Sequence, residues 1–344
     1  MDLINLLELT LKQKASDLHL SSGIAPILRI DGELQTLNLA PLESEVLFNS
    51  FKTVLTHQQI EQLQQQQELD FALELTDASR FRIHLFSQSR GISAAIRCIP
   101  STIIPLTHFD FKNTLEKICT FPHGLVLVTG PTGSGKSSTL AAMLEHINLT
   151  RSAHILSIED PIEYRFQAKK CLIQQREISK HSLNFNTALH AALRQDPDII
   201  FIGELRDAKT IRLALSAAET GHLVFASLHS ASACKTVNRI IDAFPTAEKE
   251  PIRKLFAESI QAIIAQVLLK KTTGGRVAAH EIMLSTPAIR NLIHENKIAQ
   301  LYSSLQTNSA LGMITLDQCL KSLVQQGTIL SEQARTVAHY PENF

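Results

Sequence analysis

The sequence lacks any closely spaced pair of cysteines. Its five cysteines lie far apart along the chain, and none forms a C-x-x-C pair: Cys98, Cys119, Cys171, Cys234 and Cys319. A tetrahedral zinc site usually draws on ligand pairs a few residues apart, so this spacing argues against one. An odd, scattered set suits a reducing compartment better than a framework of disulfides.

Net charge, a signal peptide and long apolar runs are also missing. The 33 basic and 33 acidic residues cancel, so the sequence does not indicate a dominant electrostatic grip on nucleic acid. The first ten residues, MDLINLLELT, have no basic segment of the kind that opens a secretory signal. No apolar run approaches the roughly 20 residues that cross a bilayer. We therefore expect a cytoplasmic protein that reaches a membrane only through a partner.

The first 100 residues have the mixed pattern of a small α+β domain. Apolar spacing predicts a helix over 3–14 and another over about 43–67. Alternating or β-rich segments, with a turn at Asp31-Gly32, predict strands. These strands are expected at 17–20, 26–30, from 34 onward, 70–75, 81–86 and 92–99.

The rest of the chain divides into a linker and a larger α/β domain. Pro100, Pro105 and Pro122 lie within or next to residues 101–121, which we expect to be a linker with one short helix near 113–120. From residue 122 to 344, continuous apolar runs alternate with helical segments, which predicts a buried parallel sheet covered by helices on both faces. The predicted strands are 125–129, 155–158, 199–202 and 223–228. After about residue 249 the pattern predicts mostly helix.

One segment of this domain has the pattern of a phosphate-binding loop. The apolar run 124–129 leads into a stretch that fits G-x-x-x-x-G-K-[ST] and opens a predicted helix. Glycines let backbone N–H groups turn toward phosphate oxygens, and the helix start adds its positive dipole end. Lys136 is expected to reach the β- and γ-phosphates of ATP, and Ser137 to ligate Mg²⁺. The predicted nucleotide-binding residues are Gly130, Pro131, Thr132, Gly133, Ser134, Gly135, Lys136, Ser137 and Ser138.

Acidic residues follow two other predicted strands of the same sheet. Glu159-Asp-Pro-Ile-Glu163 comes after the strand at 154–158, and Gly203-Glu204 comes after the strand at 198–202. Ligands of parallel sheets gather beyond the carboxyl ends of the strands. Hydrolysis requires a group that orients water and a carboxylate near Mg²⁺, and these segments supply candidates for both.

Two histidines bracket a third apolar strand. His222 and His229 are seven residues apart, and an odd separation places them on opposite faces of an ideal strand. This argues against both binding one metal ion from within the strand. We expect each to lie at a strand end, where it faces phosphate or a neighbouring subunit, or only packs.

Together these segments resemble the superfamily of secretion ATPases that drive type IV pili and type II secretion, and within it the pilus-retraction ATPases. The resemblance covers essentially the whole chain. It rests on the phosphate loop, on Ile158–Glu163 as the aspartate box, on Gly203-Glu204 as the end of Walker B and on Thr220–His229 as the histidine box. Further matches are 15–20, 341–344 and the retraction motif Ala288, Ile289, Arg290, Asn291, Leu292 and Ile293.

The resemblance implies a fold and an activity. It implies a PAS-like N-terminal domain, a RecA-like ATPase core and a homo-hexameric ring with ATP and Mg²⁺ at subunit interfaces. The ring is expected to act on an inner-membrane pilus platform protein, to lie at that membrane, to work alongside a paralogous retraction ATPase and to power twitching motility by pilin disassembly. Nucleic acid is not an expected partner.

The resemblance also implies roles for individual residues. Glu163 positions the attacking water, Glu204 acts near Mg²⁺, and His222 and His229 couple nucleotide state to the interface. Arg82 and Arg97 match N-terminal arginines that reach the phosphates.

The chain departs from the family pattern at three positions. His294 follows the retraction motif where the family usually has arginine, and Ser227 and Ser230 stand where threonines are usual. These substitutions keep polar character but leave the strength of retraction coupling open. An ordinary amphipathic helix also explains 288–293, because Ile289, Leu292 and Ile293 form an apolar stripe.

Other functions remain as alternatives. An accessory retraction ATPase is the nearest of them. Pilus-assembly and type II secretion ATPases commonly carry an added N-terminal domain and a four-cysteine zinc element, and this sequence shows neither. A nucleotide-regulated scaffold would not require both Glu163 and Glu204. A DNA translocase is disfavoured by the neutral charge and the lack of a nucleic-acid module.

Arg82 gives the first testable prediction. In the strand from Phe81 to Leu85 it alternates away from the apolar face, so a rigid strand presents its charge to a transition state. Arg82→Ala should lower the ATP turnover number while leaving the circular-dichroism melting temperature nearly unchanged. Normal turnover in this variant would remove Arg82 from the catalytic site.

Overall fold

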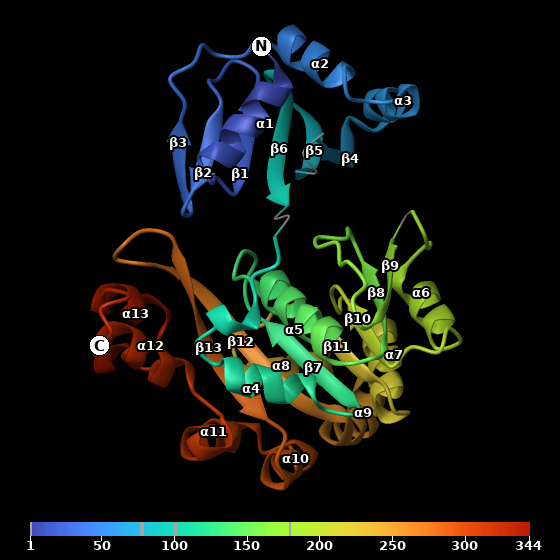
Figure 1. Ribbon diagram of the computed structural model, residues 1–344, viewed down its shortest axis with the longest axis vertical. Coiled ribbons are helices and arrows are strands. Elements are labelled where there is room, and N and C mark those ends of the chain that lie inside the picture. The colour runs from blue at the N-terminus through green and yellow to red at the C-terminus, as the bar shows by residue number, and fades with distance from the viewer. Residues whose placement is uncertain (1, 76–78, 100–101, 179) are drawn as a thin grey trace. The chain divides into compact units, whose positions relative to one another are not determined.

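The computed structural model describes residues 2–344 except 76–78, 100–101 and 179. The chain forms two compact units, residues 1–102 and 103–344 (Figure 1). Each unit has its own hydrophobic core, and each is described separately below.

The first unit is an antiparallel sheet of six described strands in the order β3-β2-β1-β6-β5-β4, with three helices. Phe81, Ile83 and Leu85 are fully buried on one face of β5 and pack with Leu18 and Leu20 of β1. The elements are α1 Leu3–Lys12, β1 Asp17–Ser21, β2 Ile27–Ile30, β3 Glu33–Thr36, α2 Ser44–Lys52, α3 His57–Gln66, β4 Glu68–Glu74, β5 Arg80–Gln88 and β6 Gly91–Ile99.

The single helix expected over 43–67 was wrong, because two helices, α2 and α3, occupy this segment. Thr56 is extended, with φ −75° and ψ 160°, and therefore ends any continuous helix. Its hydroxyl accepts the Gln59 N–H while the Gln59 side chain accepts the Thr56 N–H. This reciprocal capping box stabilises a fresh helix start at the point where helical spacing alone predicted continuation.

The second unit is built on a seven-stranded sheet in the order β13-β12-β7-β11-β10-β8-β9. All neighbouring pairs from β12 to β9 are parallel, and β13 alone runs antiparallel. Every residue of β7, β10 and β11 is buried. Successive side chains of a strand point to opposite faces, so full burial means that both faces of the sheet are covered. This confirms the parallel α/β core that the sequence predicts.

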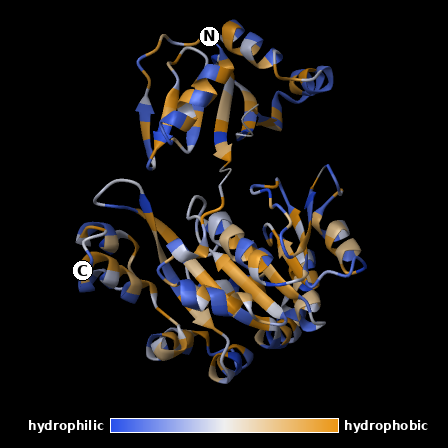
Figure 2. Cartoon of the chain, viewed as in Figure 1, coloured by the Kyte–Doolittle hydropathy of each residue, from blue (hydrophilic) through white to orange (hydrophobic). Residues whose placement is uncertain are grey.

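Hydropathy follows the same layering, since the central strands are strongly apolar and polar residues lie on the outer helices and loops (Figure 2). The elements up to β11 are η1 Leu106–His108, α4 Lys112–Cys119, β7 Gly124–Thr129, α5 Lys136–Thr150, β8 His154–Glu159, β9 Leu172–Glu177, α6 Phe185–Ala192, β10 Ile199–Ile202, α7 Ala208–Glu219 and β11 Leu223–Leu228. Those that follow are α8 Ala233–Asp242, α9 Thr246–Ser259, β12 Ile260–Lys270, β13 Arg276–Leu284, α10 Pro287–His294, η2 Ile298–Gln300, α11 Leu301–Thr307, η3 Ser309–Leu311, α12 Leu316–Gln325, α13 Ser331–Val337 and η4 Pro341–Asn343.

The short helix expected near 113–120 is α4, whose Leu115 and Ile118 are fully buried in the second core. One expectation for this unit needs correction. The expectation of mostly helix after residue 249 missed β12 and β13, which pair from Ala262 with Leu284 to Lys270 with Arg276. The apolar run in β12 also suits a buried helix, and only its pairing with β7 and β13 makes it a strand.

No helix in the described parts of the chain combines the length and the apolar character needed to traverse a lipid bilayer.

His280 is a buried polar residue in this core. It lies on β13, is 3% exposed, and neither ring nitrogen has a hydrogen-bond partner among the described residues. Its ring packs edge-on against Phe111, with centroids 5.9 Å apart, and lies 6.4 Å from the ring of Phe109. Burial lowers the pKa of His280 to about 4 from the usual 6.5. The folded state therefore holds this imidazole neutral.

We predict that His280 weakens the fold in acid. The unfolded chain binds a proton near pH 6.5 but the folded chain only near pH 4, so the free energy of unfolding falls as pH drops through this window. The loss should total about 3 kcal/mol. About 2 kcal/mol of this loss falls between pH 6.5 and pH 4.5, and denaturant titrations of the protein and of His280→Leu at these two pH values measure it.

His280→Leu should show a distinctly shallower pH dependence than the parent protein. His108→Leu is the control, because solvent reaches His108 in the folded state as well. Equal pH dependence in the parent and in His280→Leu would show that this histidine is not the source.

Candidate functional site

The phosphate loop lies at the carboxyl end of β7 and leads into α5, which begins at Lys136. Gly130 has φ +148°, and a Cβ atom there would come within 2.3 Å of the Gln266 carbonyl oxygen. Gly135, with φ +89°, is the N-cap residue of α5 and offers no capping side chain. The N–H groups of the first turn of α5 therefore have no side-chain cap, as a phosphate site requires.

Lys136 is held inside this loop. It is 8% exposed, and its Nζ donates to the carbonyl oxygens of Gly130 and Pro131, each at 2.9 Å. Burial lowers the pKa of Lys136, while the negative charges of Glu204 and Glu163 act in the opposite direction. The ammonium is thus desolvated and surrounded by acceptors, and phosphate oxygens fit the same donor set.

A histidine joins Lys136 to Glu204. Lys136 Nζ lies 3.4 Å from His229 Nδ1, and His229 Nε2 lies 3.2 Å from Glu204 Oε1. An ammonium has only donors, so Nδ1 accepts and the ring proton sits on Nε2, which donates to the carboxylate. One imidazole therefore links Lys136 of the loop to the acid that follows β10.

Arg206 holds the other side of the Glu204 carboxylate. Its Nε donates to Glu204 Oε2 at 2.8 Å, and its guanidinium lies 3.6 Å from Asp160 Oδ2. The hydrogen bond to Glu204 raises the pKa of Arg206 further. Arg206 thus connects the acids that follow β8 and β10. The sequence pattern alone gave this arginine no role.

The acids after β8 occupy different environments. Glu159 is 4% exposed, and its Oε1 accepts from Ser157 Oγ at 2.7 Å and from Gln175 Nε2 at 3.3 Å. Burial raises the pKa of Glu159 to about 7. The negative charge of Glu163 acts to raise the pKa of Lys136. Glu163 is therefore the acid of this segment whose field reaches the phosphate loop, and Glu159 is packed in the interior.

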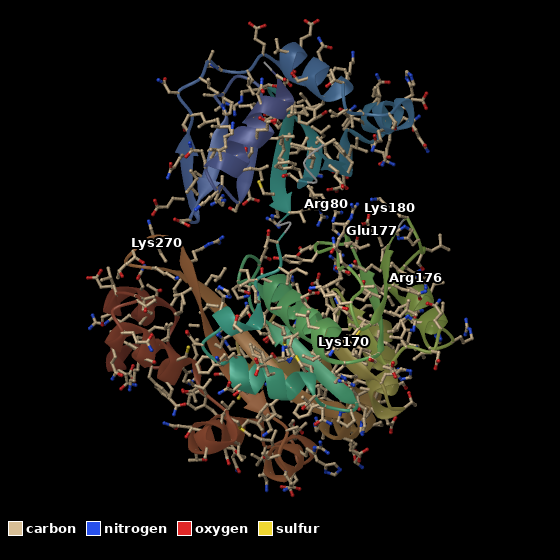
Figure 3. All side chains as sticks on the ribbon, viewed as in Figure 1. Arg80, Lys170, Arg176, Glu177, Lys180 and Lys270 are labelled. Atoms are coloured by element: carbon tan, nitrogen blue, oxygen red, sulfur yellow. The ribbon has the colours of Figure 1, made fainter. Side chains whose placement is uncertain are left out.

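Strand β9 and helix α5 hold the aspartate box, residues 158–163, from two sides. Glu177, at the carboxyl end of β9, accepts a hydrogen bond from the Ile162 N–H at 3.1 Å and forms an ion pair with Lys180 at 2.5 Å (Figure 3). The Tyr164 hydroxyl lies 2.8 Å from Ser138 Oγ on α5. These contacts fix the loop that carries Glu163 relative to the start of α5.

The two histidines lie at opposite ends of β11, as the sequence predicts. His229 follows the carboxyl end of β11, beside the loop. His222 precedes the amino end, where its carbonyl accepts the Gly124 N–H and its Nδ1 lies 3.0 Å from the Ala217 carbonyl oxygen. A six-residue strand spans about 20 Å, so His222 lies far from the loop of its own subunit.

Arg82 and Arg97 lie opposite each other on β5 and β6 of the first unit. Both side chains are about half exposed, and each is near one acid. Arg97 donates to Asp17 at 3.0 Å, and Arg82 lies 4.0 Å from Asp70. Like charges placed directly opposite each other destabilise a sheet, which makes this pair a candidate anion contact.

The predicted retraction motif lies on α10. Ile289 and Ile293 are fully buried one turn apart and anchor the helix. Arg290 donates to Ser285 Oγ at 2.8 Å, whereas Ala288 and Asn291 are exposed. The motif therefore combines a packing face with an exposed face. The amphipathic-helix interpretation accounts for the buried face, and the retraction-motif interpretation concerns the exposed face.

Gln266 of β12 is a site residue that sequence reasoning missed. It is 2% exposed, its Nε2 donates to the Ser134 carbonyl at 2.6 Å, and its Oε1 accepts from Thr139 Oγ1 at 2.8 Å. One side chain thus ties the phosphate loop to the first turns of α5. The only signal in the sequence is a glutamine within an apolar run.

Nucleotide and magnesium fit these residues. The uncapped start of α5, the desolvated Lys136 and the positive-φ turns at Gly130, Gly133 and Gly135 would hold phosphates. Ser137 and Glu204 supply the hard oxygen donors that Mg²⁺ prefers.

Residues 2–335 match the protein family described as type II/IV secretion system protein. The chain is 52% identical over 344 residues, all of both chains, to the type IV pilus retraction ATPase PilT of Pseudomonas aeruginosa. It is 35% identical over 335 residues to the type IV pilus ATPase PilU of the same organism, covering 97% of this chain and 88% of PilU. The solved structure of the pilus retraction motor PilT with bound ADP matches 100% of this chain and 99% of its own, at 40% identity and TM-score 0.88.

Gln266→Leu tests the tie between β12 and the loop. Leucine matches the size of glutamine but leaves the Ser134 carbonyl and the Thr139 hydroxyl without this partner. We expect a loss of about 1–3 kcal/mol in the free energy of unfolding and about tenfold weaker ATP binding by calorimetry. Gln261→Leu, on the same strand but bonded to Arg290, should bind ATP normally. Equal ATP affinity in both variants would show that Gln266 does not shape the loop.

Proposed function

The chain belongs to the family of type II/IV secretion system proteins, and from this premise we propose that it is an ATPase motor that powers type IV pilus retraction. The observation that carries the proposal is the continuous contact from Lys136 through His229 to Glu204 at the phosphate loop. A binding loop alone would need only the lysine. The attached acid and histidine give the site a means to respond when nucleotide is bound and hydrolysed.

ATP and Mg²⁺ are the proposed cofactors. Residues 130–138 bind the phosphates, and Ser137 and Glu204 hold Mg²⁺, which neutralises charge that develops on the γ-phosphate. Lys136 exchanges its contacts with Gly130 and Pro131 for phosphate oxygens. Glu163 orients the attacking water, consistent with its field at Lys136.

Nucleotide binding then changes the contacts of His229. When Lys136 turns to phosphate, Nδ1 of His229 loses its donor, and the hydrogen bond of Nε2 to Glu204 is free to rearrange. Glu204 carries this change to Arg206, and Arg206 to Asp160. The chemistry thereby alters contacts well beyond the phosphates, as a motor requires.

The assembly that uses this change is a homo-hexamer with PAS-like N-terminal and RecA-like C-terminal domains. The placement of His222 at the opposite edge of the sheet suits a contact with a neighbouring subunit. Arg82 and Arg97 supply positive charge to an interfacial site from the first unit. The ring acts on an inner-membrane pilus platform protein, from the cytoplasmic side, with a paralogous ATPase as a further partner.

An accessory retraction ATPase is the second candidate. The higher identity to PilT than to PilU, 52% against 35%, favours the primary motor. Expression in a type IV-piliated strain that lacks its own retraction ATPase separates the two candidates. A primary motor restores twitching by itself, whereas an accessory enzyme does so only when the resident primary motor is present.

Steady-state ATP hydrolysis across a range of protein concentrations tests the enzyme itself. Specific activity should rise with concentration, because interfacial sites form only in the assembled ring. Lys136→Ala should abolish ATP binding by calorimetry, and Glu204→Ala should lower turnover about 100-fold or more. Glu219→Ala, at the exposed end of α7, is the matched acid control and should remain active.

A parent protein that binds ATP but turns over no faster than Glu204→Ala would contradict the motor and favour a nucleotide-regulated scaffold. DNA-stimulated, salt-sensitive turnover would favour a translocase instead.

A further inference from the structure

A cavity of about 620 Å³ lies next to the contact network formed by Lys136, His229, Glu204 and Arg206. Its walls come from the segments after β10 and β11, from Ile211 of α7 and from one face of α8. Arg206 and His229 line it, so the cavity directly adjoins the residues that hold Glu204. Its volume lies within the range of sites that bind small ligands or peptide side chains.

One stripe of α8 faces this cavity. Lys235, Asn238, Arg239 and Asp242 are spaced at i, i+3, i+4 and i+7, and all four are exposed. Within the described parts of the chain neither Lys235 nor Arg239 has an ion-pair partner, whereas Asp242 is paired with Lys249 at 2.5 Å. Two like charges one helical turn apart destabilise a helix unless an anion lies near them.

The floor of the cavity is apolar. Leu205, Ile211 and Leu228 line it together with the small side chains of Ala231 and Ala243. No phenylalanine, tyrosine or tryptophan is present among its described lining residues, so the large aromatic side chains on which single-stranded nucleic acids stack are missing there. An apolar floor below a cationic rim is complementary to an apolar side chain flanked by carboxylates.

We propose that this cavity binds an acidic peptide segment of a partner protein, with an apolar side chain on the floor and carboxylates at Lys235 and Arg239. Lys235 and Arg239 have no ion-pair partner among the described residues, so the occupant supplies the carboxylates.

Arg206 couples the occupant to the catalytic network. Its side chain is 56% exposed, lines the cavity and already shares its guanidinium between Glu204 and Asp160. A peptide carboxylate at Arg206 competes with Glu204 for the same donors. Glu204 is then held by fewer donors and can act at the phosphate loop, so the occupied cavity speeds hydrolysis. Binding does not depend on the proposed function, whereas this coupling rests on it.

Fluorescence anisotropy tests binding without nucleotide. The probe is a labelled pool of capped tripeptides with glutamate at both ends and an equal mixture of leucine, isoleucine, methionine and phenylalanine in the middle. The pool should bind the full-length protein, more weakly as salt is raised.

The double variant Lys235→Glu, Arg239→Glu should bind about tenfold more weakly or not at all. Ala243→Phe, which fills the cavity without changing charge, should also lose binding. Lys321→Glu, an exposed lysine on α12, should bind normally.

The outcomes separate the alternatives. No binding of the pool, or equal binding by all variants, overturns the site. Binding of oligothymidylate that the double variant abolishes would assign the cavity to nucleic acid, and a changed sedimentation coefficient in the double variant would assign it to a second copy of this chain. In the parent protein the pool should raise ATP turnover at least about twofold, and binding without this rise overturns the coupling alone. An inactive parent that still binds the pool would instead count against the proposed function.

Discussion

The parallel alignment of four strands is the constraint on which the rest of this structure depends. Pairing places Thr129, Leu228, Ile202 and Ile158 at one edge of the sheet, so the residues that follow them emerge together. Gly130, His229, Gly203 and Glu159 are those residues. Because parallel strands present all of their carboxyl ends on one side, a lysine, a histidine and several acids meet although long helical connections separate them in the chain.

Buried polar groups stabilise this edge at a cost in desolvation. Gln266 and Glu159 lie in the interior, and each offsets the loss of water with hydrogen bonds to groups that shape the site. An apolar side chain at either position would pack as well but would leave partners unsatisfied. The polar interior therefore specifies one geometry for the loop and for the aspartate segment.

Arg206 gives the site an outward connection. Lys136, His229 and Glu204 form the inner part, and Arg206 extends it to Asp160 and to the cavity beside α8. A change at the phosphates and a change at the cavity thus act on the same carboxylate. Such reciprocal coupling is a thermodynamic requirement when two sites share one group.

The sequence by itself predicted the phosphate loop, the acids at the ends of β8 and β10, and the parallel core. Each of these comes from a local residue pattern that favours one kind of structure. It did not determine that 43–67 contains two helices. The helical spacing and the capping residue Thr56 are both local signals, and they predict opposite structures at this point. Only the tertiary structure decided that Ile260–Lys270 is a strand, because its pairing partners are distant in the chain. The same holds for Gln266, which bonds Ser134 across 132 positions. Contacts between distant residues depend on how the elements pack, and no local pattern records them.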